Sequence, residues 1–285
     1  MAGPGSSVRA GAPPPPGMAP GTALVTGATA GIGAAFARGL AARGYDLVLV
    51  ARDQARLAAL AAELRERHAI QADVLAADLS GDEGVERVVG RIAALRALAV
   101  LVNNAGFGTA GALETAPAEV QERMVRLHVL APMRLTRAAL PGLLARAALP
   151  GPLARRDGAV VNVSSVASFL YAAGSVNYCA TKAYLTTFSE GLGAELAGTG
   201  VQVQALCPGF TRTEFHQRIG PAAGDHPAWM WLTADAVVRA SLAQLDRRGP
   251  VICVPGLQYK LLVAVVRVLP RRLIGVLTGR GYRRM

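Results

Sequence analysis

The chain has 285 residues, of which 52% are hydrophobic, 17% charged and 5% aromatic. These proportions exclude an intrinsically disordered chain and allow one domain with a large core of mainly Ala, Val and Leu. The formal net charge of +11 is concentrated at the C-terminus, because residues 247–285 contain nine basic and no acidic side chains. Residues 1–246, with 21 basic and 19 acidic side chains, are nearly neutral. Without a recognisable binding motif, this distribution does not favour nucleic acid as a partner.

Residues 1–20 are rich in Gly, Pro, Ala and Ser and include four consecutive prolines. We predict a disordered leader here, and it lacks the apolar core of a signal peptide. The sequence has no run of about 18 apolar residues, so a conventional spanning helix is not expected. Three widely spaced cysteines, Cys179, Cys207 and Cys253, form neither a metal-ligand pattern nor a disulfide framework. They favour a reducing compartment and a cytoplasmic location.

From Thr22 onwards, short apolar runs alternate with longer segments that have a helical pattern. This alternation is typical of an α/β fold, with a doubly wound parallel sheet buried on both faces and ligands bound at the carboxyl ends of its strands. The predicted strands are 23–26, 46–50, 70–76, 99–102, 159–163, 201–206 and 250–254. The predicted helices include 34–43, 53–68, 118–144, 178–198 and 234–247.

The first predicted strand is followed by T-G-A-T-A-G-I-G at 26–33, which leads directly into a helix. Glycines let such a turn approach a pyrophosphate, and the N-terminus of the helix provides free N–H groups and a positive dipole. Glycines also serve plain turns, but the position between strand and helix favours a dinucleotide site.

The end of the second predicted strand indicates which dinucleotide binds. Val50 is followed by Ala51 and Arg52, without the acidic residue that NAD sites usually place there. A guanidinium suits the 2′-phosphate of NADP, so we predict that NADP(H) is preferred over NAD(H), although Arg52 could be an ordinary surface arginine. After the third strand, Asp78 could accept from the adenine amino group or cap the helix that begins near Ser80.

The predicted reacting residues follow the fifth strand. Tyr178 and Lys182 are four residues apart and share one helix face, where an ammonium would favour the phenolate and lower the pKa of the tyrosine. Such a phenol can exchange protons with an alcohol or carbonyl near neutral pH. Ser165, at the end of the strand, can hydrogen-bond the substrate oxygen.

Together these motifs resemble the classical short-chain dehydrogenase/reductase (SDR) family. The resemblance covers residues 21–256 and rests on T-G-x-x-x-G-I-G at 26–33, N-N-A-G at 103–106, Ser165, Y-x-x-x-K at 178–182, and P-G at 208–209 followed by Thr213. It implies a single domain with a Rossmann fold of about seven parallel strands. The implied activity is hydride transfer between nicotinamide and a carbonyl/hydroxyl pair.

The resemblance also implies roles for individual residues. Tyr178 would be the general acid/base, Lys182 would lower its pKa and bind the nicotinamide ribose, and Ser165 would polarise the substrate carbonyl. Family members commonly carry Asn where this chain has His128, whose imidazole could either support the same water relay to the lysine or pack in the helix. The predicted cofactor-binding residues are Thr26, Gly27, Thr29, Gly31, Ile32, Gly33, Arg52, Asp78, Asn104, Gly106, Tyr178, Lys182, Pro208, Gly209, Thr211 and Thr213.

Both tryptophans, Trp229 and Trp231, lie in the segment 214–232, where this fold usually has a substrate lid. Phe107 and Phe169 follow strand ends near the same cleft. If these four side chains face inward, they line an apolar pocket for a lipophilic ketone, aldehyde or alcohol. Alternatively, the tryptophans pin the lid to the body of the domain.

Residues 257–285 form a basic amphipathic extension beyond the family core. Apolar stretches edged with basic side chains suit peripheral contact with an anionic membrane, but also a helix packed on the domain or on a partner subunit. The family further implies homo-oligomers through helices 118–144 and 178–198. The leading prediction is an NADP(H)-dependent oxidoreductase with a small-molecule substrate, and the alternative is a catalytically silent dinucleotide-binding scaffold at a membrane surface.

Overall fold

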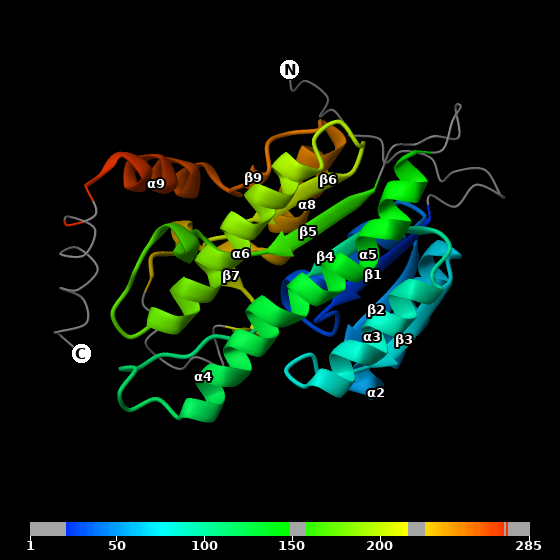
Figure 1. Cartoon of the computed structure of the whole chain (residues 1–285), viewed down its shortest axis with the longest axis horizontal. Coiled ribbons are helices and arrows are strands. Elements are labelled where there is room, and N and C mark those ends of the chain that lie inside the picture. The colour runs from blue at the N-terminus through cyan, green and yellow to red at the C-terminus, as the bar shows by residue number, and fades with distance from the viewer. Residues whose placement is uncertain (1–20, 149–157, 216–225, 271, 273–285) are drawn as a thin grey trace, which may run out of the picture.

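The computed structural model describes residues 21–148, 158–215, 226–270 and 272, so the predicted leader 1–20 lies outside the described residues. Seven parallel strands form one sheet in the order β3-β2-β1-β4-β5-β6-β9 (Figure 1). This confirms the predicted Rossmann-type, doubly wound single domain. The strands are β1 (Thr22–Thr26), β2 (Asp46–Ala51), β3 (Ala72–Ala76), β4 (Leu98–Asn103), β5 (Ala159–Val163), β6 (Gln202–Leu206) and β9 (Ile252–Cys253).

Helices cover both faces of the sheet because successive residues of each strand point to opposite sides. In β1, Val25 packs into one core cluster with α1 (Gly31–Ala41), α2 (Gln54–His68) and α8 (Ala234–Asp246). Its neighbour Leu24 packs into the other cluster with α3 (Asp82–Ala94), α5 (Ala131–Ala147) and α6 (Val176–Glu195). The chain changes face between β1 and β4, and this leaves a crevice at the carboxyl ends of those strands.

The predicted helix 118–144 is not one regular α-helix. It consists of α4 (Ala118–Val125), a π-helical turn η1 (Arg126–Leu130) and α5, with the Ala131 N–H bonded to the Arg126 carbonyl. A π-turn adds a residue to the helical turn and changes where side chains point. Here it turns His128 into the interior.

Two predicted strands are shorter than expected. The third begins at Ala72 because α2 ends with Ala69 in the left-handed region, at a φ of 51°. The last is reduced to Ile252–Cys253 at the sheet edge. Two further short strands, β7 (Thr211–Arg212) and β8 (Leu232–Thr233), pair with each other and join the two ends of the predicted lid segment.

The remaining elements lie beside the crevice. A 3₁₀ turn η2 (Val166–Phe169) follows β5, a second one η4 (Ala228–Met230) precedes β8, and α9 (Leu257–Val268) packs against η2. In Figure 1, α9 lies beyond the β9 edge of the sheet, on the opposite side from β3. Within the described residues, no helix is long and apolar enough to cross a bilayer.

Candidate active site

The turn between β1 and α1 leaves no room for side chains at its glycines. Gly27 and Gly31 have positive φ values of 65° and 54°, and a Cβ on Gly33 would lie 2.2 Å from the Gly27 carbonyl oxygen. Ile32 packs against the core. The N-cap residue Ala30 makes no side-chain hydrogen bond to the first turn of α1. The N–H groups and positive dipole of this helix end therefore suit a pyrophosphate.

Asn104 fixes the shape of this glycine turn. Its Nδ2 donates to the carbonyl oxygens of Thr26 and Gly27, at 2.9 and 3.2 Å, and its own N–H donates to Thr26 Oγ1 at 2.9 Å. Gly106 leaves space for an imidazole, since a Cβ there would lie 2.8 Å from His128 Nε2. The hydrogen bonds between Asn104 and residues 26–27 thus fix the backbone conformation at the base of the cleft.

Arg52 and Asp78 follow the carboxyl ends of β2 and β3, at the edge of the sheet where the crevice lies. Partial burial opposes ionisation of Asp78, but hydrogen bonds from Ser80 and the positive charge of Arg52 lower the pKa of the carboxyl group overall. Asp78 Oδ1 accepts from Ser80 N at 2.9 Å and from Ser80 Oγ at 2.7 Å. The N-cap of α3 is Gly81, so Asp78 holds a turn and does not cap the helix.

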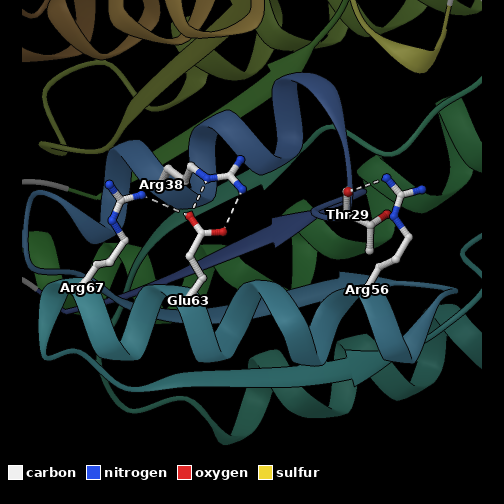
Figure 2. A network of polar contacts seen from close by, with 5 residues as sticks. All are labelled: Thr29, Arg38, Arg56, Glu63 and Arg67. Atoms are coloured by element: carbon white, nitrogen blue, oxygen red, sulfur yellow. Dashed lines mark hydrogen bonds and ion pairs between the residues drawn. The ribbon is translucent and has the colours of Figure 1, made fainter.

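Arg56, on α2, was not among the predicted site residues. Its Nη2 donates to the carbonyl oxygen of Thr29 in the glycine turn at 3.1 Å (Figure 2). The same guanidinium holds both carboxylate oxygens of Glu214, at 2.6 and 3.2 Å. An open groove of about 490 Å³ runs from here between α1 and α2 to Arg38 and Glu63. The sequence signal was a second arginine four residues after Arg52, in the first turn of the predicted helix 53–68.

The loop after β6 forms the opposite wall of the crevice. The Pro208 carbonyl accepts from Val166 N at 3.0 Å, which joins the loop to the residue after Ser165. Thr211 Oγ1 donates to the Gly209 carbonyl at 2.9 Å. The Thr213 methyl carbon lies 2.8 Å from where a Gly31 Cβ would be, so the loop closes against the glycine turn.

Tyr259, in α9, supports this loop and was not predicted. A Cβ on Gly209 would lie 2.0 Å from the Tyr259 ring. The tyrosine hydroxyl accepts from Phe210 N at 2.9 Å and donates to the Met230 carbonyl at 2.6 Å. Residues beyond 256 were interpreted as an extension, and no local pattern distinguished this buried tyrosine from an exposed one.

Ser165, Tyr178 and Lys182 meet where β5, η2 and α6 come together. Ser165 hydrogen-bonds the Tyr178 hydroxyl, and its Oγ accepts from Ala167 N at 3.1 Å. Lys182 is buried, and its Nζ donates to the Val163 carbonyl at 2.8 Å and lies 5.8 Å from the centroid of the Tyr178 ring. The three side chains predicted to react are therefore neighbours.

The ionisation of this group differs from the prediction. Burial raises the pKa of Tyr178 to about 12, although the hydrogen bond from Ser165 opposes the shift. Burial also lowers the pKa of Lys182 to about 8. The expected lowering of the tyrosine pKa is not seen because desolvation outweighs the hydrogen bond from Ser165, and the Lys182 ammonium is directed at the Val163 carbonyl. The phenol thus keeps its proton at neutral pH and can donate it to an acceptor oxygen.

His128 is 1% exposed and uses both ring nitrogens. Nε2 accepts from Phe107 N at 3.1 Å, and Nδ1 lies 3.1 Å from Thr181 Oγ1, which donates to the Tyr178 carbonyl at 2.9 Å. This network assigns the proton to Nδ1. Burial and the charge of Lys182 lower the pKa of the imidazole well below its usual value. These contacts fit an imidazole that packs inside the helix layer. The water relay from His128 to Lys182 stays a prediction.

Aromatic side chains lie near the Tyr178 ring. Phe107 lies 5.9 Å from the His128 ring, which is itself 6.0 Å from Tyr178. Phe215, in the predicted lid segment but not among the predicted substrate residues, lies 6.0 Å from Tyr178. All distances are between ring centroids.

The other predicted substrate residues have different surroundings. Trp229 is 66% exposed. Trp231 Nε1 donates to the His226 carbonyl at 3.2 Å, and its ring packs against Phe210 with centroids 5.5 Å apart. The guanidinium carbon of Arg267 lies 5.0 Å from the centroid of the Phe169 ring. Trp231 therefore ties the end of the lid segment to the loop after β6, as the alternative interpretation expected of both tryptophans, whereas the exposed ring of Trp229 does not.

Residues 21–224 match the family model described as short chain dehydrogenase. The chain belongs to this family. It is thus an oxidoreductase of the class that acts on alcohols and ketones. Among its described residues, no group of His, Cys, Asp or Glu could hold a metal ion.

Relatives of this SDR chain include proteins with assigned substrates. It is 38% identical over 200 residues to serine 3-dehydrogenase of Agrobacterium fabrum, covering 68% of this chain and 74% of the relative. A short-chain dehydrogenase from Sphingobium yanoikuyae in complex with NADPH is 36% identical, with a TM-score of 0.77 and coverage of 87% and 93%. The bulky-bulky ketone specific alcohol dehydrogenase from Comamonas testosteroni is 32% identical, with a TM-score of 0.72 and coverage of 92% of each chain. None of these relatives supports the alternative of a silent scaffold.

Proposed function

We propose that this SDR chain is an NADP(H)-dependent oxidoreductase that interconverts lipophilic carbonyl compounds and alcohols. The observation that carries the proposal is the meeting of Ser165, Tyr178 and Lys182 beside the glycine turn at the carboxyl edge of the sheet. Residues 21–256 form the proposed catalytic unit.

The residues of the crevice fit a phosphorylated dinucleotide. Because Gly27, Gly31 and Gly33 have no side chains, a pyrophosphate could come close to the backbone there. The N-terminus of α1, which no side chain caps, would bind its negative charge. Arg52 and Arg56 stand at the side where a 2′-phosphate would lie, and the relative from Sphingobium was solved with NADPH. When bound, the nicotinamide supplies or accepts the hydride.

Side chains of the protein would hydrogen-bond the substrate oxygen and supply its proton. Ser165 and Tyr178 can both hydrogen-bond a carbonyl oxygen, which polarises the carbonyl group. Tyr178, with its pKa raised to about 12 by burial, would donate its proton to that oxygen during reduction. Lys182 would stabilise the negative charge that then develops on the phenolate.

The lipophilic substrate class is argued from this chain's own residues, since the relatives' names range from serine to bulky ketones. Phe215 lies against the Tyr178 ring, and Phe107 lies against the His128 ring that itself contacts Tyr178, so both would contact a substrate held there. A panel of ketones and aldehydes with NADPH, followed by nicotinamide absorbance, tests this class. A clear preference for small hydrophilic sugars would contradict it.

Tyr178→Phe tests the proposed chemistry. We expect turnover to fall roughly 10²- to 10⁴-fold, the usual contribution of a positioned acid, with dinucleotide binding retained. Tyr184→Phe, a half-exposed tyrosine on the same helix, is the control. Undiminished hydride transfer in Tyr178→Phe would refute the assignment. Absence of turnover in the unmodified protein across the panel would favour a silent scaffold.

Arg52→Gln tests the cofactor preference. Losing a charge-assisted contact to the 2′-phosphate should lower the preference for NADPH over NADH by roughly ten- to a hundredfold. Arg96→Gln, an exposed arginine just before β4 and so at the amino edge of the sheet, is the matched control. An unchanged ratio of NADPH to NADH affinity in Arg52→Gln would contradict the role of this arginine.

We further propose a cytoplasmic homo-oligomer that pairs through the α4–α5 and α6 helices. Leu130 and Tyr184 leave exposed apolar surface on these helices. Sedimentation of Leu130→Glu against the unmodified chain tests the pairing, since a buried carboxylate would weaken it. A monomeric unmodified chain would contradict it.

A further inference from the structure

Helix α9 exposes apolar side chains on the face that points away from the domain. Leu257, Leu261, Val265 and Val268 are spaced by four, four and three residues, so they share one face, and all are more than half exposed. The opposite face buries Tyr259. A helix that is apolar on both faces is expected to be covered on both. We call the four exposed side chains the outer stripe.

Contacts made by the inner face of α9, the face that carries Tyr259, fix the direction in which the outer stripe points. The Tyr259 hydroxyl joins the helix to Phe210 and Met230, and Gln258 Nε2 donates to the Trp229 carbonyl at 3.3 Å. The helix cannot rotate to bury the outer stripe without breaking these contacts. Its exposure is therefore a fixed feature of the fold.

Charges around the outer stripe indicate its partner. Lys260 and Arg267, one heptad apart, lie on one flank of α9, and the chain has no acidic side chain after Asp246. Arg267 lies over the Phe169 ring, and its ion contact with Glu190 is long, at 3.9 Å, with both side chains half exposed. A second copy packed with α9 against α9 would bring like charges together, whereas an anionic bilayer offers an apolar interior beneath negative headgroups.

We propose that the outer stripe docks α9 on an anionic lipid surface, with Leu257, Leu261, Val265 and Val268 inserted among the acyl chains. Lys260 and Arg267 lie at the headgroups. The contact is peripheral. It places Trp229 and η2, next to Ser165, on the membrane-facing side of the domain. The docking does not rest on the proposed substrate, because lipid binding is measured without turnover.

The test uses the full chain and co-sedimentation with vesicles of phosphatidylcholine, with or without phosphatidylglycerol. We expect at least about tenfold tighter partitioning to the anionic vesicles. Leu261→Glu should lower that partitioning at least about tenfold, because it removes an inserted side chain and adds a negative charge. Leu113→Glu is the matched control, since the two leucines are 55% and 60% exposed, and it should bind like the unmodified chain.

Three kinds of result would overturn the proposal. The first is a failed binding test, which means either equal partitioning of Leu261→Glu and Leu113→Glu or no binding by the unmodified chain. The second is a dimer that Leu261→Glu dissociates while no variant binds vesicles, which would make the outer stripe an interface between copies. The third is a fall in Tm of several degrees in lipid-free Leu261→Glu but not in Leu113→Glu, which would show that the chain itself covers the stripe.

Discussion

Replacing His128 by Leu is expected to destabilise the protein and to remove part of its pH dependence. The substitution leaves the partly buried Phe107 N–H without its acceptor and takes Nδ1 away from Thr181. A buried unsatisfied N–H costs about 1–3 kcal/mol, and the second bond contributes about 1 kcal/mol. The free energy of unfolding should therefore fall by about 2–4 kcal/mol near neutral pH, where the imidazole is uncharged.

The pH dependence follows from the lowered pKa of His128, which burial and the charge of Lys182 hold well below 6.5 in the folded protein. Between that lowered pKa and 6.5, the unfolded chain binds one proton more than the folded chain. The contribution of His128 is therefore complete above about pH 6.5 and is lost as the pH falls, by at most about 1.4 kcal/mol per pH unit. His128→Leu should show a shallower slope in this acidic range.

Urea unfolding at several pH values between about 5 and 8, followed by far-ultraviolet circular dichroism, measures both effects. His68→Leu removes an imidazole from the end of α2 and serves as the control. If His128→Leu kept the full acidic slope of the unmodified protein, His128 would be charged in the folded state. The neutral, doubly hydrogen-bonded imidazole inferred above would then be wrong.

Three further predictions concern the crevice and its support. Gly33→Ala should lose most of its dinucleotide affinity in a fluorescence titration, because the new Cβ would meet a backbone oxygen at 2.2 Å, whereas Gly142→Ala, with open space around it, should bind normally. The kcat/KM for carbonyl reduction should fall roughly tenfold per pH unit above about pH 8, because Lys182 loses its charge there. A kcat/KM that stays constant up to about pH 10 would contradict this prediction. Tyr259→Phe should lower the free energy of unfolding by about 1–3 kcal/mol, because Phe210 N and the Met230 carbonyl lose their buried partner. An unchanged urea midpoint would contradict this prediction and show that water replaces the hydroxyl.

The sequence by itself determined the parts of this protein that depend on local pattern. Apolar runs and helical periodicity predicted the seven strands, because burial on both faces of a parallel sheet demands near-continuous apolar residues. The glycine turn at 26–33 was visible because its close backbone approaches tolerate no side chain. Tyr178 and Lys182 were placed together because their spacing is one helical turn, and that geometry needs no information from elsewhere in the chain.

The tertiary structure decided what depends on segments far apart in sequence. The π-turn that buries His128, the ion pair of Arg56 with Glu214 and the support of the loop after β6 by Tyr259 all join residues that no local pattern connects. It also reversed the expected direction of the Tyr178 pKa. A charged neighbour four residues away can be seen in a sequence, but the desolvation that opposes its effect is set by every element packed around the phenol.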